Sequence, residues 1–121
     1  MITKTIPPII KVWEKSIANR NPKIMTDLYT NDAILLATYE TLLVGKENIM
    51  GYFVDFLDKD NLQCKIIENY TQNFSSNQVA SGIYLFSFSD KVWKKKVVEA
   101  RYSFVIAGGK IINHHSSVVP V

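Results

Sequence analysis

Two strand-like segments near the C-terminus carry the residues best suited to chemistry. Residues 97–106 and 111–120 are rich in β-branched and aromatic side chains and flank Gly108-Gly109, a pattern typical of a β-hairpin. If Ile106 pairs with Ile111 across this turn, Ser103 lies opposite His114. Because side chains alternate along a strand, one face then carries five polar or ionisable residues: Glu99, Arg101, Ser103, His114 and Ser116. The sequence therefore predicts a polar patch on an otherwise apolar sheet.

Arg101 is the strongest single candidate in this patch. A guanidinium among apolar neighbours needs a partner, since an unpaired buried charge is very costly. One interpretation is a structural ion pair with Glu99, two residues away on the same face. The other is recognition of an anion at the mouth of a pocket, which a single arginine can clamp through two hydrogen bonds. The two roles can coexist.

The adjacent histidines have different expected environments. His114 could act as a general base, because an imidazole titrates close to neutrality. Alternatively, it is a core histidine with hydrogen bonds to Ser103 or Ser116, as buried polar groups usually have partners. His115 should lie on the outer face next to Tyr102, where subunit contact is the more natural role. Side chains of adjacent strand residues diverge and no third ligand is suitably spaced, so we expect no metal site.

Composition excludes several other functions. The net charge is only +3, and the local cluster Lys91, Lys94, Lys95 and Lys96 has Trp93 as its single stacking candidate, so we expect no nucleic-acid partner. Cys64 is the only cysteine, which excludes an intramolecular disulfide. No apolar run reaches the ~20 residues of a membrane span, and the N-terminus has no unbroken apolar segment. We expect a cytoplasmic protein without a membrane partner, and no cofactor is indicated.

Apolar spacing places the helices in the first half of the chain. A helix is expected from Pro7-Pro8 to about residue 18, with Ile10, Trp13 and Ile17 among its apolar residues. Asn21 and Pro22 are suited to cap and begin a second, short helix. A third helix is expected from Lys46, bounded by residues 58–61.

The strands follow these helices. Residues 29–32 are expected to form a turn, and residues 33–37 a buried strand. Strands are further expected at 63–70 and 78–89, followed by the hairpin described above. Helices followed by consecutive antiparallel strands predict a single α+β domain over residues 1–121, with the sheet curled around the helices. Several aromatic residues then belong either to the core or to a pocket wall: Trp13, Tyr29, Tyr39, Tyr52 and Phe53.

Several segments, in this order, resemble the nuclear transport factor 2-like (SnoaL-like) superfamily. They are residues 28–36, 45–49, 81–84, 99–105 and 114–117, followed by Pro120. The branch they are most similar to is the association domain of calcium/calmodulin-dependent protein kinase II. The resemblance implies a cystatin-like, cone-shaped fold, a strongly curved antiparallel sheet wrapped around N-terminal helices. It also implies a pocket at the open end and an outer sheet face that is commonly a dimer interface.

The same resemblance bears on the site. In the kinase's association domain, the position matching Arg101 is an arginine that lines the pocket, and a histidine matches His114. Two other pocket arginines of that domain are matched here by Phe86 and His115. SnoaL-like cyclases and ketosteroid isomerases use an inward aspartate as the base, but the last strand here has Asn113 and no aspartate.

Two functions remain open from the sequence. The first is a homo-oligomeric domain with a pocket for a small anionic or polar ligand, lined by the patch residues Glu99, Arg101, Ser103, His114 and Ser116 with Trp13, Tyr29 and Tyr52. The second is a small-molecule enzyme of the isomerase, dehydratase or cyclase type, with His114 as acid/base and Arg101 orienting an oxyanion.

Overall fold

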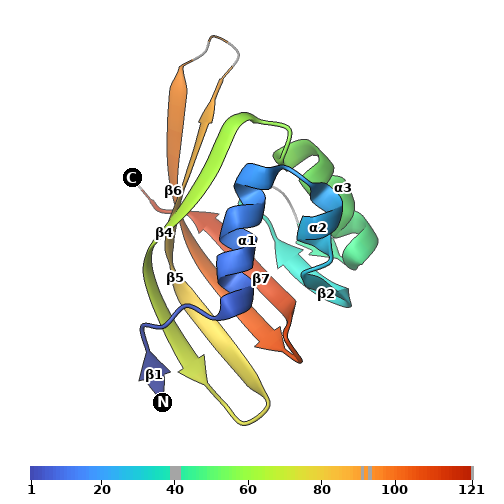
Figure 1. Ribbon diagram of the computed structural model, residues 1–121, viewed down its shortest axis with the longest axis vertical. Coiled ribbons are helices and arrows are strands. Elements are labelled where there is room, and N and C mark those ends of the chain that lie inside the picture. Colours follow the sequence, from blue (N-terminus) through green and yellow to red (C-terminus); the bar gives the residue numbers. More distant parts are fainter. Residues whose placement is uncertain (39–41, 91, 93, 121) are drawn as a thin grey trace.

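The computed structural model describes residues 1–38, 42–90, 92 and 94–120. Three helices and seven strands follow one another along the chain (Figure 1). In chain order they are β1 (Ile2–Thr3), α1 (Pro8–Asn19), α2 (Pro22–Thr26), β2 (Tyr29–Leu36), β3 (Leu42–Val44), α3 (Lys46–Phe56), β4 (Asp60–Asn73), β5 (Asn77–Ser89), β6 (Lys95–Ala107) and β7 (Lys110–Val118).

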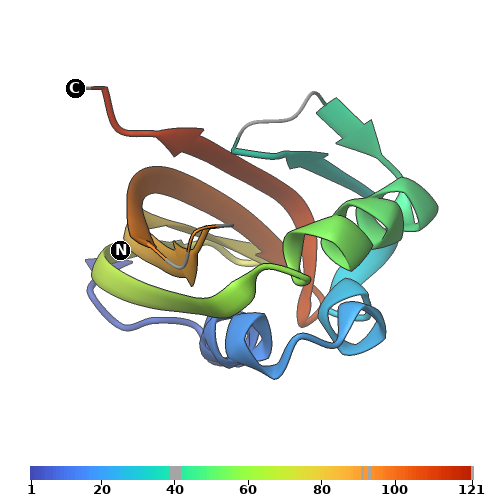
Figure 2. The ribbon, with the colours of Figure 1, turned by 90° about the horizontal axis from the view of Figure 1, so that it is seen from above.

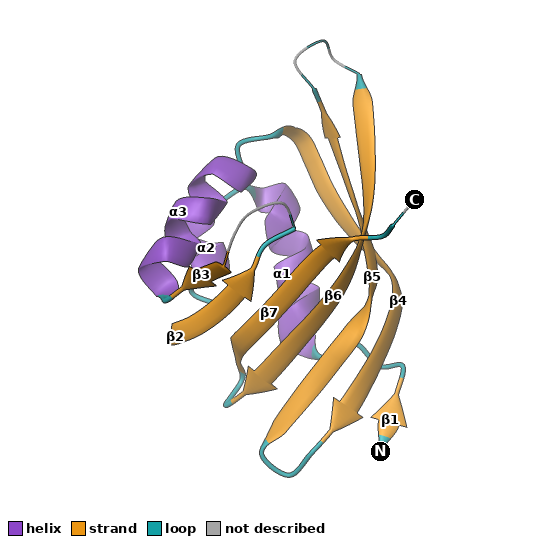
Figure 3. Cartoon of the chain, turned by 180° about the vertical axis from the view of Figure 1, so that it is seen from behind, coloured by secondary structure: helices purple, strands orange, loops and turns teal. Residues whose placement is uncertain are grey.

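The strands form one curved sheet in the order β1-β4-β5-β6-β7-β2-β3. Every neighbouring pair is antiparallel except β2 and β7, which are parallel. The three helices lie on one face of the sheet (Figure 2), and the view from behind shows the opposite face without a helix over it (Figure 3). The predicted α+β class with a curved sheet around N-terminal helices is therefore confirmed.

The first two helices begin and end where the sequence indicates. Pro8 begins α1, whose buried face includes Ile10, Trp13 and Ile17, and Arg20 ends the helix in a left-handed conformation with φ 58°. The Asn21 side chain caps α2 by accepting hydrogen bonds from the backbone N–H groups of residues 23 and 24, both at 3.1 Å.

The segment that follows α2 differs from the prediction. Residues 29–32 are not a turn but the first half of β2, which runs to Leu36. An irregularity between Tyr29 and Ile34 lets this strand pair in parallel with β7, so that Tyr29 lies beside Ile111. The polar residues Asn31 and Asp32 are exposed within this irregular stretch, which explains why the sequence resembles a turn there.

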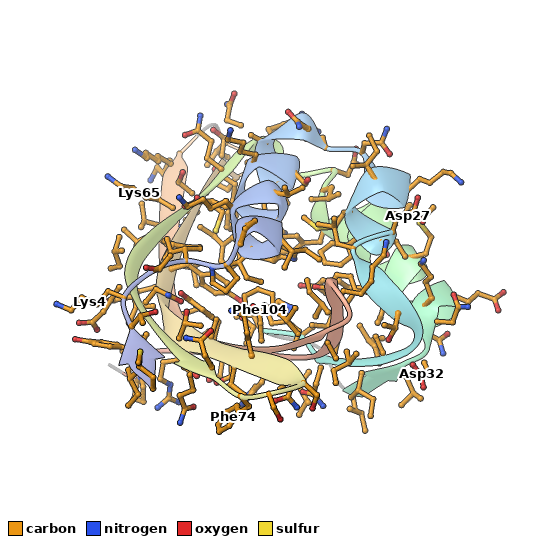
Figure 4. All side chains as sticks on the ribbon, turned by 60° about the horizontal axis from the view of Figure 1, so that its bottom comes forward. Lys4, Asp27, Asp32, Lys65, Phe74 and Phe104 are labelled. Carbon is orange, nitrogen blue, oxygen red and sulfur yellow. The ribbon has the colours of Figure 1, made fainter. Side chains whose placement is uncertain are left out.

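The core between α1 and the sheet is aromatic. Trp13 stacks on Tyr84 with ring centroids 5.5 Å apart and meets Phe104 edge-on at 5.3 Å. Phe104 lies in the interior beneath α1, whereas the labelled charged side chains lie at the periphery (Figure 4). Of the aromatic residues expected in the core or in a pocket wall, Trp13, Tyr29 and Phe53 are buried in the core. Tyr39 lies outside the described residues.

In the described part of the chain, no helix is long and apolar enough to cross a bilayer. The lysines of the predicted basic cluster that the structure describes, Lys94, Lys95 and Lys96, are exposed. Lys91 and Trp93 lie outside the described residues. The cytoplasmic location and the lack of a nucleic-acid partner stay predictions.

Candidate functional site

The β6–β7 hairpin forms around Gly108 and Gly109 as predicted, but its register is not the uninterrupted pairing that the sequence analysis assumed. Ile106 pairs with Ile111, whereas Val105 pairs with Asn113, because Ile112 is an extra residue in β7. His114 consequently lies opposite Phe104 and not opposite Ser103. The prediction that Ser103 lies opposite His114 is therefore wrong.

This one-residue bulge divides the predicted polar patch between the two faces of the sheet. His114 and Ser116 lie on the inner, helix-covered face, where their exposed fractions are 2% and 5%. Glu99 and Arg101 lie on the outer face and are exposed, and Ser103 is half-buried there. The prediction that Arg101 and His114 project together into the hollow of the sheet is wrong.

The outer-face residues also differ in their contacts. Among the described residues, Glu99 and Arg101 do not form an ion pair with each other, and Arg101 lies opposite Ser117 of β7. Ser103 exchanges a hydrogen bond with Ser81 at 3.2 Å. His115 is exposed on the outer face as predicted, but it pairs with Ser103 and not with Tyr102.

His114 occupies the centre of a buried polar group. Its Nδ1 lies 2.8 Å from Tyr29 Oη, and its Nε2 lies 3.2 Å from Tyr84 Oη. The ring also stacks on Phe104, with centroids 3.9 Å apart. The interpretation of His114 as a core histidine with satisfied hydrogen bonds is confirmed, although its partners are two tyrosines and not the expected serines.

Burial determines the charge state of this imidazole. Removal from water, with a smaller contribution from the neighbouring His115, lowers the pKa of His114 from 6.5 to about 3. Burial also raises the pKa of Tyr29 and of Tyr84 well above the usual value. At neutral pH all three groups are therefore uncharged, and a histidine with such a low pKa is a poor general base.

A cavity opens between α3 and the sheet, close to this polar group. Its volume is about 350 Å³, and α3 with the residues after it contributes Gly51, Tyr52, Asp55, Phe56 and Lys59. The remaining lining residues are Leu43 of β3, Phe86 and Phe88 of β5, Val98 of β6, and Thr38, which follows β2. We call this space the α3 cavity.

A much smaller space, of about 10 Å³, lies deeper and reaches His114 and Ser116. It shares four lining residues with the α3 cavity: Thr38, Tyr52, Phe56 and Phe86. A volume of this size is at the lower limit for one water molecule. Of these two spaces, the α3 cavity is therefore the one that can accept an organic molecule without movement of side chains.

The walls of the α3 cavity are mainly aromatic. Phe56 meets Phe86 edge-on at 5.3 Å, and Tyr52 stacks on Phe56 at 5.4 Å. Lys59 places its ammonium 4.9 Å from the ring centroid of Phe88, and Asp55 lies on the same wall. The described lining residues thus contribute one cation and one anion. Such a site can enclose an apolar body and offers few polar groups to orient it.

The predicted site residues thus separate into four groups. Tyr52 lines the α3 cavity; Trp13, His114 and Ser116 line only the deeper space; and Tyr29 contacts His114 from behind it. Glu99, Arg101 and Ser103 are on the other face of the sheet.

Sequence reasoning missed most of the cavity wall, although two signals pointed to it. Tyr52 and Phe56 have the i, i+4 spacing that places side chains on one face of α3. Phe86 occupies a position that the family resemblance had matched to a pocket residue. No sequence signal identified Thr38, which lies just after β2.

The described residues provide neither a metal site nor an activated cysteine. No group of three or more His, Cys, Asp or Glu side chains in these residues could hold a metal ion. The half-buried Cys64 has its thiol pKa raised, mainly by burial and further by Glu14, so it is not an activated nucleophile.

The curved sheet with helices over one face is the cystatin-like fold of nuclear transport factor 2-like proteins. A superfamily member from Salmonella enterica serovar Typhimurium superposes with a TM-score of 0.80 at 14% identity, covering 93% of this chain and 87% of that one. A ketosteroid isomerase-like protein from Catenulispora acidiphila, solved with trimethylamine, gives a TM-score of 0.76 at 16% identity over 93% and 85% of the two chains.

Within this fold, the chain belongs to the calcium/calmodulin dependent protein kinase II association domain family, whose model matches residues 3–120. A candidate association domain of this kind from Xanthomonas campestris is 34% identical, with a TM-score of 0.85 over 97% of this chain and 94% of that one. No curated protein matches the sequence significantly.

Proposed function

We propose that this chain is a self-associating domain that binds a small, mainly apolar molecule in the α3 cavity. The observation that carries the proposal is the cavity itself, about 350 Å³ with aromatic walls from α3 and β5. This volume falls within the range of small-molecule sites, which are typically apolar with a few polar groups.

An anionic ligand is not favoured. Arg101, the predicted anion-binding residue, lies on the opposite face of the sheet. Phe86 occupies a position that the family resemblance matches to a pocket arginine of the kinase's association domain. The charges on the wall, those of Lys59 and Asp55, have opposite signs.

The alternative of an enzyme with His114 as acid/base has less support. Both ring nitrogens lie at hydrogen-bond distance from tyrosines, and the pKa of His114 is lowered to about 3. Only the space of about 10 Å³ separates this ring from the α3 cavity, so a substrate cannot reach it without rearrangement.

A cavity-filling substitution tests the binding proposal. Gly51 is exposed on α3 and lines the cavity, and a Cβ atom there meets no atom within 4 Å. In Gly51→Leu the new side chain should occupy the cavity while the helix remains intact, since leucine is a better helix former than glycine.

We expect wild-type amide resonances of the cavity residues to shift with acetophenone in a heteronuclear NMR titration, and Gly51→Leu to weaken this binding at least tenfold. The control is Ile24→Leu on α2, an exposed residue away from the cavity, which should bind as the wild type does. Equal binding by Gly51→Leu and the wild type would contradict the proposed site.

Self-association is supported by the face of the sheet that no helix covers. Alternation along β5 directs Ile83 and Leu85 to this face, and Val105 of β6 lies there as well; all three remain partly exposed. The family is named for association, and an uncovered sheet face with apolar residues is suited to a symmetric contact with a second copy.

A charge placed on this face should prevent assembly. We expect the wild type to have the mass of a dimer or larger oligomer in size-exclusion chromatography with light scattering at tens of micromolar. Ile83→Glu should shift it to the mass of one chain, whereas Ile24→Glu, on exposed α2, should not. A wild-type monomer at this concentration would refute self-association.

A further inference from the structure

The outer face of the sheet carries two neighbouring rows of cross-strand residues with opposite charges on β6. In the first row, Arg101 lies between Ile83 of β5 and Ser117 of β7. In the second row, two residues along the strand, Glu99 lies beside Leu85 of β5. Figure 3 shows this face, with β6 between β5 and β7. We call these rows the Arg101 row and the Glu99 row.

Neither charge has a partner within the described chain. Arg101 and Glu99 are exposed, and among the described residues neither side chain forms an ion pair or a hydrogen bond. Because β6 is the central strand of the sheet, a contact that covers the middle of this face covers both residues. A charge removed from water without a partner is very costly. A favourable contact must therefore place an anion over Arg101 and a cation over Glu99.

A second copy of the chain can supply both charges. We consider a twofold axis that lies in the plane of contact, perpendicular to β6, and crosses the strand at Ala100. This axis exchanges the two rows, so that Arg101 of each copy faces Glu99 of the other. Ile83 of each copy then faces Leu85 of the other. Sheets that pack face to face lie about 10 Å apart, which an arginine and a glutamate side chain can span together.

Charges on β4 agree with the same axis. Glu68 pairs with Ile83 and extends the Arg101 row, whereas Lys65 pairs with Leu85 and extends the Glu99 row. Both residues are exposed, and their signs are opposite to those on β6 in the same rows. The axis therefore also brings the acidic end of one row opposite the basic end of the other, at the rim of the contact.

Other positions of the axis are unfavourable. Moving it by one residue along β6, to Arg101 or to Glu99, would place two like charges opposite each other. Like charges across an interface are strongly destabilising and exclude wrong registers. The charge pattern thus favours one register of the two copies over its neighbours.

We propose that two copies of this chain pair through the outer sheet face, with antiparallel β6 strands and two reciprocal ion pairs between Arg101 and Glu99. Ile83 and Leu85 form apolar contacts beside these pairs. The proposal rests on the self-association proposed above, and it adds the register of the contact and the residues that determine its specificity.

Reversing one charge at a time should separate the copies. Glu99→Arg gives a chain with two arginines at these positions, and Arg101→Glu gives a chain with two glutamates. Both contacts of each homodimer would then join like charges. We expect sedimentation equilibrium to give a dissociation constant for this contact at least about a hundredfold above that of the wild type. Circular dichroism should be unchanged, because both side chains are exposed in the single chain.

Restoration of the dimer identifies the partner of each charge. An equimolar mixture of Glu99→Arg and Arg101→Glu should associate as the wild type does, because each contact again joins an arginine with a glutamate. An ion pair within one chain would not be restored by mixing. Lys15→Glu, on the exposed side of α1, is the control, since it changes the net charge as Arg101→Glu does and should leave association unchanged.

The outcomes separate this proposal from the one on which it rests. A wild type that remains monomeric overturns both. A wild-type dimer whose single variants associate equally well, or whose mixed variants stay monomeric, overturns the reciprocal ion pairs and leaves self-association through another contact. Dissociation of both single variants with recovery on mixing supports the proposed register.

Discussion

Substituting Gly82 by alanine should severely destabilise the fold. A Cβ atom at Gly82 would lie 1.9 Å from the backbone oxygen of Glu68 and 2.8 Å from the Tyr102 hydroxyl. The first contact is with backbone and cannot be relieved by a rotamer change. We expect a loss of about 3 kcal/mol or more in the free energy of unfolding, the upper end of the cost of overpacking.

The close approach has a structural cause. The register of β4 shifts between Ile66 and Glu68, and this bulge bends the strand toward β5 at Gly82. Tyr102 Oη fills the remaining space and donates to Asn69 Oδ1 at 2.7 Å. Without a glycine at this point, the sheet could not curve so closely around the helices.

Urea denaturation at one fixed protein concentration measures the effect, since self-association would make stability depend on concentration. Gly51→Ala is the matched control, because its new Cβ atom meets nothing within 4 Å and helix propensity favours alanine by about 0.5–1 kcal/mol. Gly82→Ala with wild-type stability would show that the strands are not this close.

Acid should destabilise the protein through His114. Its pKa is about 3 when folded and 6.5 in an unfolded chain, so the unfolded state binds the proton more tightly. The contribution of neutral His114 to the free energy of unfolding is therefore fully present above pH 6.5, and it is lost as the pH decreases toward 3. The full difference corresponds to about 5 kcal/mol, of which about 2 kcal/mol should be lost between pH 7.5 and pH 5.

The adjacent histidine is the control for this effect. The free energy of unfolding, measured from pH 7.5 to pH 5, should keep its slope in His115→Gln, since His115 is exposed on the outer face. The slope should flatten in His114→Gln, whose overall stability should also fall because two tyrosine hydrogen bonds change. A wild-type curve that is flat above pH 5 would contradict the buried neutral state.

Much of the fold could be predicted because local signals agreed with the final structure. The spacing of Trp13 and Ile17 predicted α1, Asn21 predicted the start of α2, and Gly108-Gly109 predicted the last hairpin. These features depend on residues close in sequence, for which periodicity and capping are informative.

The faces of β6 and β7 could not be predicted, because one extra residue reverses them. Nothing in the sequence around Ile112 marks it as a bulge. Its insertion nevertheless places His114 on the inner face and leaves Arg101 on the outer face. The parallel pairing of β2 with β7 was missed for a similar reason, since it joins segments that are distant in sequence.

The candidate site was predicted only in part for the same physical reason. Tyr52 could be identified as a core or pocket aromatic from its helix alone. The partnership of Tyr29 and Tyr84 with His114 brings together three elements, and Thr38 becomes a cavity residue only through the packing of β2 beside β7.

The neutral, doubly hydrogen-bonded state of His114 underlies the account of the buried polar group, and nitrogen NMR of its ring observes that state directly. Because the Trp13 indole can only donate to Tyr29, the Tyr29 hydroxyl donates to His114, so at pH 7 we predict an unprotonated Nδ1 and a protonated Nε2, with no titration of this ring down to pH 5. A proton on Nδ1, or titration near pH 6.5, would contradict this arrangement and restore His114 as a candidate base.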